Sequence, residues 1–377
     1  MAKRILQFGT SRFLQGHADF FVHEARQQGQ DIGPITVVKT TRGGAREGRV
    51  AAFSDPKGFP VRLRGYKSGQ LVDETTQVTS VRRALDANTQ WAELKRIFNE
   101  EAEIVFSNVG EAGYELSDQD RPFSAVPDTS PNSFPMKLLA LLSHRFANSS
   151  KPLLVLPCEL ASQNGQKLRQ LVVDLSKEMA QGEAFRTWLA QSVMFCDTLV
   201  DRIVSEAIEP IGAIGEPYGL WAIERKPGFV EPLQHPCIVY TDNLEPYLRL
   251  KLHILNLGHT FLAEIWQREN RPKDETVREI LKDQSVKQRL LALYNDEILP
   301  GFAAHNMGPA ATDYVKTTVE RFENPFLNHR LSDIAQNHGQ KIERRMVDFM
   351  NWAKAQNAAL KFGALREVVE KNSRELV

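Results

Sequence analysis

A lysine, an asparagine and a histidine lie within nine residues of one another in the segment KLHILNLGH, from Lys251 to His259. Leucines and an isoleucine stand between the polar positions and no proline interrupts them, so the pattern predicts a helix. At about 100° per residue, Lys251 and His259 lie about 80° apart and Asn256 lies between or beside them. All three side chains can therefore project toward one cavity.

These three residue types can together carry out redox chemistry on an alcohol. A lysine that an apolar wall shields from water has its pKa lowered toward neutrality, so that it can accept a hydroxyl proton. The amide of Asn256 can donate to the developing alkoxide, and His259 can orient it. The alternative is a buried structural helix whose lysine reaches water and whose Asn256 and His259 are hydrogen-bonded core residues.

The composition limits the kind of protein. With 377 residues, of which 42% are hydrophobic, the chain can bury a large core and is expected to divide into two domains. Its 47 basic residues balance 47 acidic ones, which argues against a nucleic-acid or membrane partner. No stretch approaches the roughly 18 apolar residues of a membrane span.

The chain start and the cysteines bear on the compartment. The opening MAKRILQFG is interpreted as a first strand rather than a signal peptide. The three cysteines are widely separated and odd in number, so we expect a cytoplasmic protein without a disulfide framework. The nine histidines form no H-x-x-x-H pair, and no metal site is predicted.

Strands and helices alternate along the first part of the chain. Apolar runs at 5–8, 35–39, 104–107 and 153–156 are interpreted as buried strands, with helices at 13–26, 91–99 and 136–146. From about residue 243 onward, helical patterns replace the strands. The sequence predicts an α/β protein, with a Rossmann-like, doubly wound dinucleotide-binding domain at 1–235 and a mostly helical substrate and catalytic domain at 236–377.

Two turns of the first domain are candidates for cofactor binding. The first strand leads into Gly9-Thr10-Ser11-Arg12-Phe13, where a dinucleotide fold has its phosphate-binding turn. The G-x-G-x-x-G pattern is incomplete, because Ser11 stands at its second glycine and Leu14 at its third. The second strand leads into KTTRGG, where Arg42, with Arg46 close by, could accept a 2′-phosphate or belong to a solvated turn. The choice between NAD and NADP stays open.

Several segments together resemble one family. The chain is similar to the mannitol dehydrogenase family of polyol-specific long-chain dehydrogenases, and within it to the hexuronate branch typified by tagaturonate reductase (altronate oxidoreductase). The similar segments follow in order over nearly the whole chain: ILQFGTSRFLQGHADFF, VFSNVGEAG, LPCELASQNG, FCDTLVDRIV, KLHILNLGHT and RFENPFLNHRL. The Lys, Asn and His at spacings of five and three are the most specific signature, and Lys251, Asn256 and His259 match it.

The resemblance implies a role for each catalytic residue. Lys251 is the general base in oxidation and the acid in reduction, Asn256 polarises the reacting carbonyl, and His259 binds the adjacent hydroxyl. On the cofactor side, Asn108 and Glu111 approach the nicotinamide ribose.

On the substrate side, the resemblance implies that Asp201 lies near the substrate, unless it forms a structural ion pair with Arg202. Arg321 opens the R-F-x-N-P segment, and His329 and Lys341 follow at positions from which they reach the same pocket or stand on the surface. An arginine matches a carboxylate with two parallel donors, which suits a sugar acid.

One departure within the family concerns the substrate. In the sugar-alcohol branch the segment after the fourth strand reads C-D-N, whereas Cys158-Glu159-Leu160 stands here, as in the hexuronate branch. The leucine side chain cannot donate a hydrogen bond to the reacting oxygen. Polarisation of the substrate carbonyl therefore depends more on Asn256, with Asn164 as a second candidate donor.

We therefore expect a metal-independent, NAD-dependent dehydrogenase, with NADP possible, that interconverts a keto sugar acid and its hydroxy acid. The substrate pairs are of the tagaturonate/altronate or fructuronate/mannonate type. The alternatives are a polyol or polyol-phosphate dehydrogenase and a non-catalytic NAD(P)-binding sensor. The expected partner is a small molecule, without nucleic acid or membrane, and a monomer and a homo-oligomer are equally compatible with the sequence.

Overall fold

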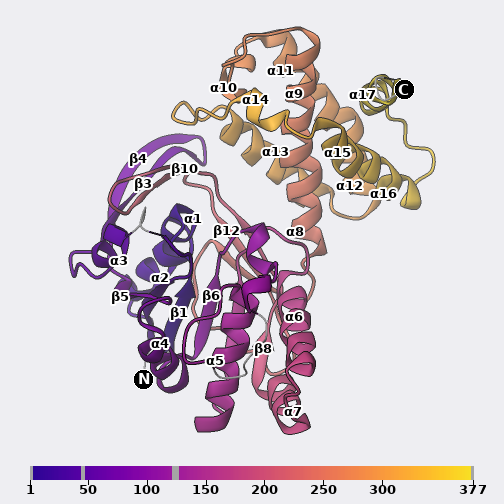
Figure 1. Cartoon of the computed structure of the whole chain (residues 1–377). Coiled ribbons are helices and arrows are strands. Elements are labelled where there is room, and N and C mark those ends of the chain that lie inside the picture. Colours follow the sequence, from indigo (N-terminus) through magenta and orange to yellow (C-terminus); the bar gives the residue numbers. More distant parts are fainter. Residues whose placement is uncertain (1–2, 44–46, 121–126, 375–377) are drawn as a thin grey trace. The chain divides into compact units, whose positions relative to one another are not determined.

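The computed structural model of the chain describes residues 3–43, 47–120 and 127–374. The chain forms two compact units (Figure 1). The first comprises Met1–Leu63 and Glu74–Leu244, and the second comprises Arg64–Asp73 and Glu245–Val377. Among the described residues, no helix is long and apolar enough to cross a membrane.

A six-stranded sheet forms the centre of the first unit. Its order is β5-β2-β1-β6-β7-β8, and every neighbouring pair is parallel. The strands are β1 (Lys3–Phe8), β2 (Ile32–Lys39), β5 (Val81–Asp86), β6 (Ile104–Ser107), β7 (Leu153–Pro157) and β8 (Val193–Phe195). Numbered within this sheet alone, the order is 3-2-1-4-5-6, the order of dinucleotide-binding folds, with the reversal between β1 and β6. The predicted doubly wound sheet is confirmed.

Two hydrophobic cores cover the two faces of this sheet. Because side chains alternate along a strand, Leu6 and Phe8 of β1 enter one core while Ile5 enters the other. The first core includes residues of α4 (Trp91–Glu100), α5 (Phe134–Asn148), α6 (Asn164–Glu178) and α7 (Glu183–Ser192), and the second includes residues of α2 (Ala18–Gln27). In α4, Trp91, Leu94 and Phe98 recur at helical spacing and are buried.

The other strands form two smaller sheets, which the sequence did not predict. One has the order β10-β11-β3-β4, the other β13-β12-β9. Their strands are β3 (Phe59–Lys67), β4 (Gln70–Val78), β9 (Thr198–Asp201), β10 (Val204–Ala207), β11 (Ala213–Gly215), β12 (Leu220–Glu224) and β13 (Ile238–Thr241). The remaining helical segments of this unit are α1 (Arg12–Gly16), α3 (Glu47–Phe53), η2 (Glu111–Tyr114) and η3 (Asp118–Asp120).

The second unit is mostly helical, as predicted. Three of its helices continue through a π-helical turn: α8 (Glu245–Leu250), η4 (Lys251–Asn256) and α9 (Leu257–Arg268); α11 (Gln284–Leu293), η5 (Tyr294–Ile298) and α12 (Leu299–Ala304); and α15 (His338–Ile342), η6 (Glu343–Val347) and α16 (Asp348–Gln356). The others are α10 (Val277–Ile280), α13 (Gly308–Phe322), α14 (Leu331–Ile334) and α17 (Ala364–Arg374).

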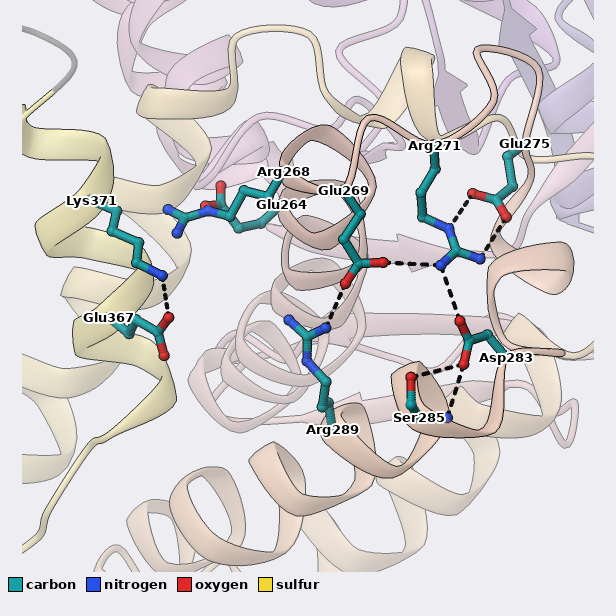
Figure 2. Close-up of polar contacts among 10 residues, drawn as sticks. All are labelled: Glu264, Arg268, Glu269, Arg271, Glu275, Asp283, Ser285, Arg289, Glu367 and Lys371. Carbon is teal, nitrogen blue, oxygen red and sulfur yellow. Dashed lines mark hydrogen bonds and ion pairs between the residues drawn. The ribbon is translucent and has the colours of Figure 1, made fainter.

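An ion-pair network fixes the connection between α9 and α11 (Figure 2). Arg271 holds Glu275 with two donors, Nε at 2.9 Å and Nη2 at 3.1 Å, while its Nη1 reaches Glu269 at 3.0 Å and Asp283 at 3.1 Å. Asp283 in turn caps the first turn of α11 by accepting from the backbone N–H of Ser285. The Arg271 guanidinium thus joins the end of α9 to the start of α11.

The tip of the β3–β4 hairpin belongs to the second unit. Asn324 Nδ2 donates to the Arg64 carbonyl at 3.0 Å, and the Arg64 guanidinium lies 4.0 Å from the centre of the Phe326 ring. Gly65 has a φ of +136°, and a Cβ there would stand 2.4 Å from Asn324 Nδ2. The asparagine of the R-F-x-N-P segment therefore anchors the hairpin tip, at which only glycine fits.

Candidate active site

The Gly9 turn lies at the reversal point of the large sheet. Gly9 has a φ of +115°, and a Cβ there would come within 2.5 Å of the Asn108 carbonyl, which follows β6. Ser11 caps α1 by accepting from the Leu14 N–H at 3.2 Å, and its hydroxyl donates to Asn108 Oδ1 at 2.9 Å. Serine at the second glycine position therefore ties the two strand ends together. Glycine at position 9 lets the backbone of the turn approach the end of β6 closely.

The other residues of this turn differ in exposure. Thr10 is buried, Arg12 is exposed, and Phe13 is half-buried with its ring stacked 4.8 Å from that of His17. Asn108 Nδ2 donates to the Cys158 carbonyl at 2.8 Å, so its amide bridges the ends of β6 and β7.

The end of β2 carries a lysine that is already paired. Lys39 is buried and donates to Asp86 at the end of β5, at 2.7 Å. Burial alone would raise the pKa of Asp86, but hydrogen bonds from Lys39 and Asn88 prevail and hold it below its usual value. Arg42 is exposed, and Arg46 lies outside the described residues.

Glu159 organises the loop that follows β6, a role that sequence reasoning missed. Its buried carboxyl group accepts from Ser107 Oγ at 3.1 Å, Tyr114 Oη at 3.0 Å and the Val109 N–H at 3.0 Å. Burial raises the pKa of Glu159 even though these bonds oppose the rise. Glu111 begins the helical turn within this loop, and its side chain lies outside what the structure describes.

The structure gives Asn164 contacts of its own. Its Nδ2 donates to the carbonyls of Pro157, Glu159 and Thr198 at 3.0 to 3.1 Å, and its Oδ1 accepts from the N–H groups of Gly165 and Thr198 at 2.9 Å each. Both ends of this buried amide are engaged, which favours a structural role over the predicted substrate contact. Asp201 ends β9 and is buried, with 4% of its surface exposed.

The predicted catalytic segment begins with a π turn, not with an α turn. In a regular α-helix, five residues correspond to a rotation of about 140° beyond one full turn. The side chains of Lys251 and Asn256 would then point in different directions. A π turn, with its i→i+5 hydrogen bonds, has between about four and five residues per turn, so a residue five positions on lies much closer to the first in direction than in an α-helix. Lys251–Asn256 is such a turn, and the α-helix that follows carries His259 three residues beyond Asn256. The spacing of five and three thus fits one wide turn followed by one ordinary turn.

His259 is buried in a cationic environment. Its ring lies 4.4 Å from that of Phe322 and 4.9 Å from that of His329. Burial lowers the pKa of His259 well below 6.5, and the neighbouring basic residues His329, Arg321, Arg345 and Lys341 lower it further. His259 is therefore a neutral imidazole at neutral pH.

Those basic residues include all three that were predicted to bind the substrate. Arg321 is buried, with Nη1 3.5 Å from Tyr314 Oη. His329 is half-buried, its Nδ1 has no hydrogen-bond partner among the described residues, and burial lowers its pKa. Lys341 donates to the Ile334 carbonyl at 2.7 Å. The structure thus gathers these predicted residues around His259.

Arg345 is the member of this group that sequence reasoning missed. Its Nη1 donates to the Asn256 carbonyl at 3.0 Å and to Thr260 Oγ1 at 2.8 Å, and burial lowers its pKa to about 10. It stands four residues after Lys341, the spacing that stacks two side chains on one helix face, and this was the available signal. Neither side chain pairs with a carboxylate among the described residues.

Residues 3–232 match the mannitol dehydrogenase Rossmann domain, and residues 243–369 match the mannitol dehydrogenase C-terminal domain. The chain belongs to the mannitol dehydrogenase family. The predicted family is confirmed. In the part of the chain that the structure describes, no three His, Cys, Asp or Glu side chains gather as metal ligands would.

The mannitol dehydrogenase family relatives include two altronate oxidoreductases. The one from Halalkalibacterium halodurans is 31% identical, over 93% of this chain and 71% of that protein. The one from Bacillus subtilis is 30% identical, over 91% of this chain and 73% of that protein.

Two solved structures share the fold. One is the Pseudomonas fluorescens mannitol 2-dehydrogenase ternary complex with NAD and D-mannitol, with a TM-score of 0.72 and 20% identity over 98% of this chain and 78% of that one. The other is D-sorbitol dehydrogenase in substrate-free form, with a TM-score of 0.77 and 16% identity over 93% of this chain and 76% of that one.

Proposed function

We propose that this member of the mannitol dehydrogenase family is an NAD-dependent oxidoreductase that interconverts a keto sugar acid and its hydroxy acid, of the tagaturonate/altronate or fructuronate/mannonate type. The observation that carries the proposal is the set of Lys251, Asn256 and His259 on one π-to-α helix, with cations gathered at His259. The relatives named altronate oxidoreductase support the same substrate class.

Each of the three helix residues has its own role at the reacting carbonyl or hydroxyl group of the substrate. In the direction of reduction, the Lys251 ammonium gives its proton to the carbonyl oxygen, and the Asn256 amide donates to that oxygen as negative charge develops on it. His259, neutral because of its lowered pKa, can donate to the neighbouring substrate hydroxyl without adding charge. Bound NADH supplies the hydride. In the reverse direction Lys251 accepts the hydroxyl proton.

The first unit supplies the cofactor residues in this proposal. The Gly9 turn, from Gly9 to Phe13, and Asn108 border the reversal point of the sheet, where dinucleotides bind in such folds. A Cβ at Gly9 would collide with the Asn108 carbonyl, so glycine lets this turn lie against the end of β6. Asp86 engages Lys39, whereas Arg42, which follows β2, is exposed. NAD is the cofactor named for the Pseudomonas fluorescens enzyme, and NADP is the alternative.

The charges around His259 favour a sugar acid over a neutral polyol. Lys341 and Arg345 are like charges on consecutive turns of one helix, an arrangement that destabilises the helix unless an anion binds there. A substrate carboxylate would relieve their repulsion, and Arg345 has two nitrogens left to donate. Residues 1–235 then form the cofactor domain and residues 236–377 the substrate and catalytic domain. The three free cysteines support a cytoplasmic location.

The test is oxidation of NADH and NADPH, followed by nicotinamide absorbance, with tagaturonate, fructuronate, fructose and fructose 6-phosphate as acceptors. We expect turnover with a keto-uronate and NADH. Turnover with fructose or its phosphate alone would favour the polyol alternatives. Cofactor binding without turnover on any acceptor would favour the sensor.

Lys251→Ala tests the proton carrier directly. We expect turnover to be lost while the Kd of NADH stays near that of the unmodified protein, because the lysine acts on the substrate. Retention of more than about a tenth of kcat, a change of under roughly 1.4 kcal/mol in the barrier, would overturn the assignment.

A further inference from the structure

The three π turns of the second unit are neighbours in space. The segment η4, which carries Lys251 and Asn256, contacts both η5 and η6. A π turn is rare because it interrupts the i→i+4 hydrogen bonds of the helix, and it persists where other groups satisfy the carbonyls that it displaces. The partners of the η4 carbonyls therefore decide whether this turn keeps its shape.

The first partner is a tyrosine hydroxyl. Tyr294, the first residue of η5, is fully buried and its Oη donates to the Ile254 carbonyl at 3.0 Å. Burial raises the pKa of Tyr294, so the hydroxyl remains a donor. Gly258 makes this approach possible, because a Cβ there would stand 1.9 Å from the tyrosine oxygen. The glycine of KLHILNLGH thus provides space for Tyr294.

The second partner is the guanidinium of η6. Arg345 Nη1 donates to the Asn256 carbonyl, which also accepts from Thr260 Oγ1 at 3.0 Å. The contact is reciprocal, since the Arg345 carbonyl lies 3.1 Å from Nδ1 of His253 within η4. Both neighbouring π turns therefore hold the middle and the end of η4.

We propose that Tyr294 is a positioning residue for catalysis: its hydroxyl holds the wide turn that keeps Lys251 and Asn256 on one face of the helix. The inference rests on the proposed function, in which Lys251 carries the proton. Without the hydroxyl, the Ile254 carbonyl is left with its bond from the Leu257 N–H, which it shares with the Leu252 carbonyl, and the turn loosens. Lys251 then shifts relative to Asn256, and a shift of about 1 Å can cost on the order of a hundredfold in rate.

The test is Tyr294→Phe, with Tyr240→Phe as the matched control. Tyr240 is also largely buried and donates to a backbone carbonyl, that of Leu233, at 2.7 Å in the other unit. Both variants lose one hydroxyl and one hydrogen bond of the same kind. We expect Tyr294→Phe to lower kcat in the keto-uronate assay at least tenfold, with the KM for NADH within twofold of its original value. We expect Tyr240→Phe to leave kcat unchanged.

Two further readouts separate positioning from general destabilisation. The primary deuterium isotope effect on kcat, measured with NADH deuterated at the transferred position, should rise in Tyr294→Phe and stay unchanged in Tyr240→Phe. The melting temperatures of the two variants should fall by similar amounts. A kcat of Tyr294→Phe within twofold of the unmodified protein would overturn the proposal.

A double-mutant cycle with Gly258→Ala keeps the test decisive if the first variant folds poorly. In the presence of the Tyr294 hydroxyl the new methyl group collides with it, whereas in Tyr294→Phe the nearest ring carbon is 3.1 Å away. The double variant should therefore lose less activity than the product of the two single losses. If the activity losses of the two single variants multiply in the double variant, the result would contradict a contact between position 258 and the Tyr294 hydroxyl. If Lys251→Ala retains turnover, the proposed function fails; if Lys251→Ala is inactive and Tyr294→Phe is not, only the positioning role fails.

Discussion

His253, in the middle of the π turn, is fixed in one protonation state by its partners. Its Nδ1 faces the Arg345 carbonyl at 3.1 Å, which requires a proton on that nitrogen, and its Nε2 faces Arg249 Nη1 at 3.0 Å, which requires a lone pair there. Asp348 lies 3.4 Å from Nε2, but burial, together with Arg249, dominates and lowers the pKa of His253 to about 4. The folded protein therefore contains a neutral His253 at pH values well below 6.5.

The first prediction follows from this lowered pKa. An unfolded histidine binds a proton below about pH 6.5, whereas the folded His253 binds one only below about pH 4. Acidification between these values therefore stabilises the unfolded state relative to the folded state. The free energy of unfolding should fall by about 2 kcal/mol between pH 7.5 and pH 5 on account of this residue. Urea unfolding at both pH values measures it. His253→Gln should flatten the dependence, and an equal slope in both proteins would refute the assignment.

Lys341 offers a test of substrate charge. Because we propose that it faces the substrate carboxylate, Lys341→Met should raise the KM for the keto-uronate at least tenfold, while any activity with neutral fructose changes less than threefold. Lys316→Met removes a charge from an exposed position of α13 and is the control. Steady-state kinetics with both acceptors decide the point, and equal losses on the two acceptors would exclude a role in binding the carboxylate.

At this scale the sequence predicted the residues that are recognisable by type and spacing. Lys251, Asn256 and His259 come together on one helix, and the predicted cations gather around His259. The sequence did not predict Arg345, Glu159 or Tyr294, because their roles come from partners far away in the chain: Arg345 contacts a carbonyl 89 residues away. The π turn was missed for the same reason, since the Ile254 and Asn256 carbonyls accept from Tyr294 and Arg345, which lie on other helices.

At the scale of elements, Arg271 is the centre of the ion-pair network between α9 and α11, and Arg289 of α11 adds a bond to Glu269 (Figure 2). Arg271 makes two parallel bonds to Glu275 and reaches two further carboxylates, a geometry that lysine cannot reproduce. Arg271→Lys should lower the free energy of unfolding by about 1 kcal/mol, less at high salt, without changing turnover. Thermal unfolding at low and high salt measures this.

Arg96→Lys is the control for that variant. Arg96 also holds a carboxylate, Glu93, with two donors and reaches Glu100 and Glu101, but it lies on the exposed face of α4. Its replacement should leave the melting temperature nearly unchanged, because water already solvates both partners. Equal shifts in the two variants would mean that the lower exposure of the Arg271 network adds nothing to its contribution to stability.

The elements themselves were predictable where burial imposed a pattern. β1, β6 and β7 are short apolar runs within the large sheet, and each was located from its sequence. The hairpin strand β4, reading QLVDETTQV, was not found, because most of its side chains are exposed and no apolar alternation marks it. Partnership with other strands, not local composition, makes it a strand.

At the scale of the whole molecule, the second unit is completed by a segment far away in the sequence. The hairpin tip, Arg64–Asp73, is separated from Glu245 by the rest of the first unit, yet it packs on Asn324 and Phe326. Replacing residues 65–72 by an Asn-Gly turn should expose the 321–330 segment to protease while NADH still binds to the first unit. Limited proteolysis and NADH fluorescence measure the two effects. Leu71→Ser, at an exposed tip position, should change neither.

This arrangement also limits how relatives can be recombined. A chimaera that joins residues 1–244 of this chain to the C-terminal part of another family member would combine the hairpin tip of one parent with the asparagine anchor of the other. Gly65 and Asn324 are so close that neither side tolerates a bulkier partner. The exchangeable module is therefore discontinuous, and a working hybrid must inherit residues 64–73 and 245–377 from the same parent.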